Sequence, residues 1–147
     1  MALQAGCSSV RRDLEGAALV SQGIRRISPE SLLAAAEHAA AQSEGDFVLI
    51  GVGDSMRPHY GPGTALVVHP TSFFMLRAGM PVVYENRSGR RVAHVIVARS
   101  GRGWRARGTA GSTEDRDLVT PENLLGVVRC AFVPDAGPGD RSRLAGW

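Results

Sequence analysis

The chain contains no lysine, since all 17 of its basic residues are arginines. The arginine side chain stays protonated in proteins and cannot act as a general base. A nucleophilic serine needs a base, because its own hydroxyl is protonated at neutral pH. The sequence therefore excludes a Ser–Lys mechanism. Any base that serves a serine here must be one of the four histidines or a carboxylate.

Cysteine is nearly absent as well, with only Cys7 and Cys130 in the chain. Two isolated cysteines do not make a disulfide framework, and no group of residues has the spacing of a metal site. We therefore expect neither a metal nor any other cofactor. Cys130 lies within the apolar run 124–133 and is most simply explained as a small core residue.

Long apolar runs are also missing, because no window approaches the ~18 residues of a membrane-spanning helix. We therefore expect no transmembrane segment. The formal charge is only +3, and the arginines gather at 87–107 rather than along one helical stripe. A protein dedicated to nucleic acid is usually more basic, so the composition argues against nucleic acid as the main partner.

The N-terminal sequence Ala5-Gly6-Cys7-Ser8-Ser9 resembles the end of a bacterial lipoprotein signal, in which the cysteine becomes lipidated. A working signal has a basic start and an apolar segment of about 7–15 residues before the cleavage site. Only six residues precede Cys7. Either the start has been trimmed, or the resemblance is accidental and the N-terminus is a frayed end. The first alternative predicts a lipid anchor at Cys7 in the cell envelope or on its periplasmic face, and the second predicts a cytoplasmic protein.

The 147 residues are 44% hydrophobic and predict one domain with short extra segments at both ends. Residues 1–28 have weak periodicity and form an arm that is partly disordered or carries a short helix at 10–20. A serine and a proline at 28 and 29 are typical of a helix start, and the alanine-rich run after them predicts a helix over 29–45. The tail 134–147 is rich in Gly, Pro, Asp and Arg and is predicted to be flexible.

Between these segments the sequence predicts β-structure, over a domain of residues 46–133. Short apolar runs alternate with Gly, Pro and Asn turns, and the turn at 86–89 joins two of the runs as a hairpin. The fold class is therefore mainly β with an N-terminal helix. The expected strands span 47–52, 64–69, 80–85, 91–98, 104–107 and 124–133.

One motif after the first predicted strand indicates nucleophilic chemistry, Gly53-Asp54-Ser55-Met56-Arg57-Pro58. A serine on a tight turn at the end of an apolar strand is well placed to attack a carbonyl. His94 follows 36 residues after Pro58 on a predicted strand and is the expected general base. The plainer interpretations are an ordinary turn serine and a histidine packed within a strand.

Other residues are candidates for the same site. Asp115, or else Asp117, would hold the imidazole in one tautomer, although both lie in a polar loop that is otherwise simply solvated. His59 lies four residues after Ser55 and is an alternative base. The backbone N–H of Ser55 is a candidate donor to an oxyanion.

The residues that surround these candidates resemble a known family. The motif at 53–58 is followed by Gly61-Pro62-Gly63, by Ala78-Gly79-Met80-Pro81-Val82-Val83-Tyr84, by Ala93-His94-Val95-Ile96, by Arg107-Gly108-Thr109 and by Leu124-Leu125-Gly126-Val127-Val128. In this order, residues 47–132 resemble the catalytic domain of the signal peptidase and LexA-type serine proteases. The resemblance implies a domain of short, coiled sheets and cleavage after small residues.

The base position is similar to one branch of this family. Bacterial signal peptidases and LexA-like proteins have lysine there, whereas the endoplasmic-reticulum and archaeal signal peptidases have histidine, as here at His94. The chain departs from the family pattern at Arg107 and Thr109, where the family has a lysine and its first aspartate. Asp115 falls at the family's second acidic position, with Asp117 next to it. The histidine-type enzymes also carry a membrane anchor, and none is visible in the sequence.

Five residues are candidates for substrate binding: Val82, Val83 and Tyr84, together with Met56 and Pro58. The strand 82–84 would pair with an extended substrate, and small apolar pockets would give specificity. Met56 would pack beside the nucleophile and fix its turn. Pro58 would set the direction in which the chain leaves the turn.

The leading hypothesis is a serine endopeptidase of signal-peptidase-like type, with Ser55 as nucleophile and His94 as base, acting on a peptide or protein substrate that is exported or extended. A catalytically silent peptide-binding or scaffold module is the alternative, which Thr109 and the missing anchor favour. A self-cleaving LexA-like regulator is a third hypothesis, since Ala5-Gly6 is a suitable dipeptide. Against it, no helix-turn-helix precedes the β domain, and the self-cleaving members use lysine.

Overall fold

The computed structural model describes residues 23–135 of the chain. Three sequence expectations concern residues outside this range: the helix at 10–20, the lipidated Cys7 and the Ala5-Gly6 cleavage site. Nearly all of the predicted tail, from residue 136 onward, also lies outside the described residues.

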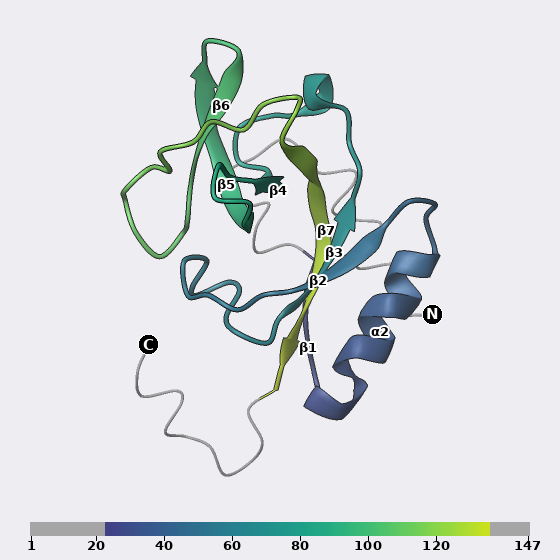
Figure 1. Cartoon of the computed structure of the whole chain (residues 1–147). Helices are drawn as coiled ribbons and strands as arrows, with labels where there is room; N and C mark the ends of the chain where they lie inside the picture. The colour runs from purple at the N-terminus through teal and green to yellow at the C-terminus, as the bar shows by residue number, and fades with distance from the viewer. Residues whose placement is uncertain (1–22, 136–147) are drawn as a thin grey trace.

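A seven-stranded, mostly antiparallel sheet carries one helix, α2, against its β2, β3 and β7 strands (Figure 1). The strand order is β2-β3-β7-β4-β5-β6, and β1 pairs in parallel with the end of β7. The mainly β fold class with an N-terminal helix is therefore confirmed. The strands are β1 (Ile24–Ile27), β2 (Phe47–Ile50), β3 (Ala65–His69), β4 (Pro81–Glu85), β5 (Arg91–Ser100), β6 (Gly103–Arg107) and β7 (Leu124–Pro134), with a short 3₁₀ helix, η2 (Phe73–Met75), between β3 and β4.

The sheet bends at three interruptions of its register. The pairing shifts by one residue between Val67 and Val68 on β3, between Val83 and Tyr84 on β4, and between Ile96 and Ala98 on β5. Such bulges increase the local twist of a strand. Apolar side chains pack against the bent sheet in three clusters, one around Met56, Tyr60 and Val83, a second around Tyr84 and Ile96, and a third between the sheet and α2.

Helix α2 (Pro29–Ala41) covers one face of β3 and β7 with small side chains. Its buried residues recur at the three- and four-residue spacing of one helix face, Leu32, Ala35, Ala36, Ala39 and Ala40. Pro29 occupies the first turn as expected, but the side chain of Ser28 makes no capping hydrogen bond. The helix ends at Ala41, four residues before the expected end, and the chain turns at Gly45 with a φ of +83°.

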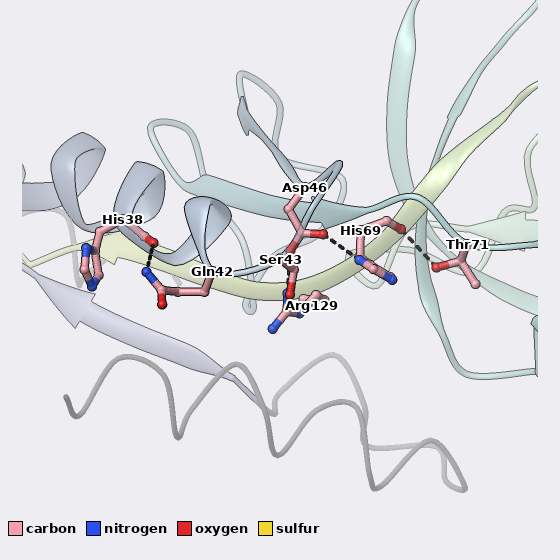
Figure 2. Close-up of polar contacts among 7 residues, drawn as sticks. All are labelled: His38, Gln42, Ser43, Asp46, His69, Thr71 and Arg129. Carbon is pink, nitrogen blue, oxygen red and sulfur yellow. Dashed lines mark hydrogen bonds and ion pairs between the residues drawn. The ribbon is translucent and has the colours of Figure 1, made fainter.

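A buried polar cluster ties the end of α2 to the sheet (Figure 2). The Asp46 carboxylate is fully buried and contacts Nδ1 of His69 and Nη1 of Arg129, each at 2.5 Å. The same Arg129 nitrogen donates to the Ser43 hydroxyl at 2.6 Å. Because His69 lies on β3 and Arg129 on β7, one carboxylate links two strands to the helix. His69 therefore has a structural role in the fold.

Two features differ from the sequence expectations. Residues 24–27 form β1, although the sequence predicted no strand before residue 47, because this short segment contains two arginines and shows no alternation. β1 lies beside Ala131–Pro134 of β7, beyond the point where the pairing with β4 ends. Cys130 is a buried core residue as expected, at 1% exposure, but its sulfur is in a disulfide bond rather than free.

Candidate active site

Ser55 and His94 are in direct contact. Ser55 lies in a turn after β2, where the N–H groups of Arg57 and His59 donate to the carbonyls of Asp54 and Met56 at 3.1 and 3.0 Å. Its Oγ lies 2.7 Å from Nε2 of His94, on β5. This separation is within the range of about 2.6–3.2 Å that a nucleophile and its base require. The two residues are 39 positions apart in the chain.

Asp115 lies behind the imidazole. Nδ1 of His94 is 2.7 Å from Oδ2 and 2.9 Å from Oδ1 of this carboxylate. The segment after β6 returns antiparallel to it, and the N–H of Asp115 donates to the Ala106 carbonyl at 2.8 Å. The side chains of His94 and Asp115 are only 13% and 16% exposed, so the contact is largely shielded from water. The order Ser55–His94–Asp115 is the order of a nucleophile, base and orienting acid.

Tyr84 is a fourth member of this network. Its hydroxyl donates to Oδ2 of Asp115 at 2.5 Å, and the residue is 1% exposed. On the β4–β5 hairpin Val82 pairs with His94 and Tyr84 with Val92, so Tyr84 and His94 lie on the same face two positions apart. Burial, and after it the bond to Asp115, raises the pKa of Tyr84, so this hydroxyl stays protonated and remains a donor.

The loop after β6 packs against the turn that contains Ser55 and forms hydrogen bonds with it. The Ser55 carbonyl accepts a hydrogen bond from the N–H of Ala110 at 3.0 Å. The Thr109 hydroxyl donates to the Arg57 carbonyl at 3.0 Å, at the position where the family that the sequence resembles has an acid. Gly108 passes so close that a Cβ there would lie 2.2 Å from the Ser55 carbonyl oxygen. Thr109 therefore anchors the turn by hydrogen bonding, and the acid is supplied six residues later.

The other candidate residues have different partners. The carboxylate of Asp117 accepts from the backbone N–H of Arg87 and pairs with its Nε, both at 2.9 Å. Nδ1 of His59 lies 3.5 Å from the hydroxyl oxygen of Thr109. The Asp54 carboxylate forms a side-chain ion pair with Nε of Arg57 at 2.6 Å. Between the two aspartates that the sequence left open, the geometry selects Asp115.

The backbone N–H of Ser55 is available to a ligand. Among residues 23–135 it donates to no hydrogen-bond acceptor, whereas the N–H groups of Arg57, His59 and Tyr60 are all used within the turn. An unused N–H beside a nucleophile can donate to an oxygen that becomes negative during attack on a carbonyl.

A cavity with a volume of about 470 Å³ lies next to this group. Ser55 and His94 both line it, together with residues 49–53 before the turn and 90–93 at the start of β5. Its walls include the apolar side chains of Met56, Leu66 and Val83. Ser55 and His94 therefore border a space large enough for several side chains of an extended ligand.

The expected pairing of a substrate with residues 82–84 needs correction. β4 is hydrogen-bonded to β5 on one edge and to β7 on the other, so its backbone has no open edge. Val83 reaches the cavity through its side chain, and Met56 lines it beside the nucleophile as expected. Val82 and Tyr84 do not line the cavity and pack in the cluster around Tyr84 and Ile96. Pro58 does not line the cavity either.

Sequence reasoning did not single out Tyr60, Arg90 and Arg91, which also line the cavity. The two arginines directly follow the hairpin turn, and Arg91 is three residues before His94. Their place at the start of the strand that carries His94 could therefore have indicated that they lie near it.

Within the described part of the chain no three His, Cys, Asp or Glu side chains gather as a metal site. In the same part, no helix has the length and apolar character needed to cross a membrane.

Comparison with known proteins gives no relative that would assign this site: the chain matches no family model and no curated protein.

Proposed function

We propose that the chain is a serine endopeptidase of signal-peptidase-like type, with Ser55 as nucleophile, His94 as general base and Asp115 as the acid that orients His94. The observation that supports this most strongly is the contact of Ser55 Oγ with His94 Nε2 at 2.7 Å, with Asp115 on the opposite nitrogen at 2.7 Å. A serine and a histidine that merely stabilise a turn and a strand need no partly buried carboxylate behind the imidazole and no adjoining cavity.

The first half of the reaction forms an acyl-enzyme. His94 carries its proton on Nδ1, donated to Asp115, which leaves Nε2 free to accept the proton of Ser55. The Ser55 oxygen attacks the peptide carbonyl carbon, and the oxyanion that forms accepts a hydrogen bond from the Ser55 N–H. His94 then gives its new proton from Nε2 to the amine as the C–N bond breaks.

The second half uses the same groups with water as the nucleophile. Water enters where the amine has left and transfers a proton to Nε2 of His94 while its oxygen bonds to the acyl carbon. Collapse of this second intermediate breaks the ester bond, and His94 returns the proton to the Ser55 oxygen. The products are a carboxylic acid and an amine, and the side chains regain their starting protonation.

Two observations favour a peptide as the substrate. The cavity is bordered by the extended stretch 49–53 and by the start of β5, and backbone of this kind can bind an extended chain. The order of motifs from Gly53 to Val128 also resembles the signal peptidase and LexA-type proteases over the residues that form the nucleophile turn, the base strand and the acid loop.

The test is cleavage of peptides that carry small residues before a candidate scissile bond, detected as two new termini by mass spectrometry. The wild-type protein is expected to cleave at least one such peptide. Ser55→Ala and His94→Gln should each lower the rate by about 10⁶-fold, as removal of a triad member does. His59→Gln is the matched control and should keep nearly full activity.

Cleavage that persists in Ser55→Ala, or that depends on His59 rather than His94, would contradict the proposal. Selective peptide binding by a wild-type protein that cleaves none of the peptides would instead support the silent binding module.

A further inference from the structure

The polar groups that line the cavity beside Ser55 are mainly hydrogen-bond donors. Arg90 and Arg91 are among the lining residues and each carries a guanidinium group, whereas no Asp or Glu is among them. Asn86 also lines the cavity, and its Oδ1 already accepts from the backbone N–H groups of Ser88 and Arg90, each at 3.0 Å. Its amide NH₂ is the part left for a ligand. The lining is therefore suited to a group that accepts hydrogen bonds and carries negative charge.

The two arginines are not neutralised by the fold. In residues 23–135 neither Arg90 nor Arg91 forms an ion pair, unlike Arg57, Arg87 and Arg129, which each pair with an aspartate. Glu85 is opposite Arg91 in the β4–β5 register, yet no ion pair joins them. Both arginines are exposed, so their charges are available at the mouth of the cavity.

Tyr60 adds a donor within the wall. The residue is 5% exposed and lines the cavity, and its hydroxyl forms no hydrogen bond with the described residues. Burial raises the pKa of Tyr60, so its hydroxyl is protonated and can donate. A protonated hydroxyl in a cavity wall, without a protein partner, can donate a hydrogen bond to a bound acceptor.

The remaining wall suits the carbon part of an acidic side chain. Leu49, Leu66, Val83 and Ala93 are apolar and surround the same space. Methylene groups of a glutamate can pack against such side chains while the carboxylate reaches donors at the mouth.

Resting on the proposed peptidase function, we propose that this cavity selects peptide substrates with an acidic side chain close to the scissile bond, bound by Arg90 and Arg91 at the mouth and by the Tyr60 hydroxyl in the wall. The substrate class is thus an extended peptide with Glu or Asp, in addition to the small residues that the family resemblance implies.

The test separates binding from cleavage by using Ser55→Ala. Fluorescein-labelled decapeptides of one scaffold carry Glu, Gln or Arg at a single position, which is moved along the peptide. Fluorescence anisotropy gives the affinity of each. At one or two positions Glu should bind about three- to tenfold more tightly than its isostere Gln, and Arg should bind least. Raising the salt concentration should reduce the preference, because the arginines are exposed.

Variants assign the preference to the proposed residues. In the Ser55→Ala background, Arg90→Gln with Arg91→Gln should abolish the difference between Glu and Gln, and Tyr60→Phe should weaken binding of the Glu peptide. Arg102→Gln is the control, since Arg102 is an exposed arginine in the β5–β6 turn that does not line the cavity. It should leave the preference unchanged.

Equal binding of Glu and Gln at every position, or a preference that survives the double arginine variant, would overturn the proposal. The outcome is distinguishable from failure of the peptidase function. A protein that cleaves peptides without a charge preference keeps the proposed function and loses this specificity. A preference for Glu in Ser55→Ala, with no cleavage by the wild type, keeps the specificity and loses the proposed function.

Discussion

Asp115 accepts hydrogen bonds from two side chains at once, the imidazole of His94 and the hydroxyl of Tyr84. A carboxylate with two fixed donors has little freedom to rotate, and its orientation determines that of the imidazole. Tyr84 does not line the cavity, so in the proposed reaction its effect would pass through Asp115. It is a positioning residue rather than a catalytic one.

Replacing Tyr84 by Phe should therefore lower kcat and leave KM nearly unchanged. The phenyl ring keeps the packing, while the lost hydrogen bond to a charged group contributes about 1.5–3 kcal/mol in proteins. If about 1.4 kcal/mol of this loss falls on the transition state, the rate drops by about tenfold. Steady-state kinetics on the best peptide measures both constants.

Tyr60→Phe is the matched control, because this tyrosine lines the cavity and does not contact Asp115. It should raise KM and change kcat little. Unchanged kcat in Tyr84→Phe, or a loss that appears in KM alone, would show that the hydroxyl does not position the acid.

At this scale the sequence predicted part of the site. Ser55 and His94 could be singled out because each stands within a short motif that suggests its role. Asp115 could not be separated from Asp117, since both lie in one polar loop two residues apart. The choice depends on how that loop aligns with β6, where the N–H of Asp115 donates to Ala106. The role of Tyr84 depends on the same alignment.

Among the elements, the loop from Gly108 to Asp115 connects the two halves of the site. Its first residues hold the carbonyl of Ser55, and its last residue holds His94. A shift of this loop therefore moves the nucleophile and the acid together.

Gly108→Ala tests this connection. The new Cβ would lie 2.2 Å from the Ser55 carbonyl oxygen, so backbone must move, and the Ser55–His94 contact should lengthen. We expect kcat/KM to fall by about a hundredfold, the loss typical of a displacement near 1 Å. Gly111→Ala is the control, because nothing lies within 4 Å of its added Cβ.

Thermal unfolding of both variants shows whether the chain still folds. A folded Gly108→Ala protein with wild-type kcat/KM would contradict the view that this loop sets the position of Ser55.

The sequence predicted the positions of most strands in the chain, but it did not predict which strands lie next to each other in the sheet. The hairpin of β4 and β5 follows from two apolar runs joined by a short turn with Gly89, whose φ is +76°. The central position of β4 does not follow from its own residues, since its partners on β7 lie 40 to 45 positions later in the chain (Tyr84 with Leu124, Val82 with Val127). This is why Val82–Tyr84 was wrongly expected to pair with a substrate.

Both tyrosines of the chain are buried, and their burial makes the free energy of unfolding depend on pH. Burial raises the pKa of Tyr60 and of Tyr84, the latter also through Asp115. In the unfolded chain both groups titrate near pH 10. A raised pKa in the folded state means that the folded protein holds protons which the unfolded chain releases above that pH. The stabilisation is therefore complete below about pH 10 and is lost as the pH rises further.

We accordingly expect the free energy of unfolding, measured by urea denaturation, to fall between pH 9 and 11. Each buried tyrosine contributes a slope of up to about 1.36 kcal/mol per pH unit above pH 10. Tyr84→Phe should remove the part of the slope that Tyr84 contributes, and the part contributed by Tyr60 should remain. A free energy of unfolding that is independent of pH up to 11 would show that the tyrosines are not sealed from solvent in solution.

The central claim is that Ser55, His94 and Asp115 form one reactive group, and the most direct test is the rate at which a fluorophosphonate labels the protein, followed by intact mass. The wild-type protein should gain one phosphonyl group, on Ser55, and Ser55→Ala should gain none. Asp115→Asn should be labelled about 10⁴-fold more slowly, while Asp117→Asn should react at the wild-type rate. A wild-type protein that gains no more label than Ser55→Ala, or an Asp115→Asn variant that reacts as fast as wild type, would contradict the account.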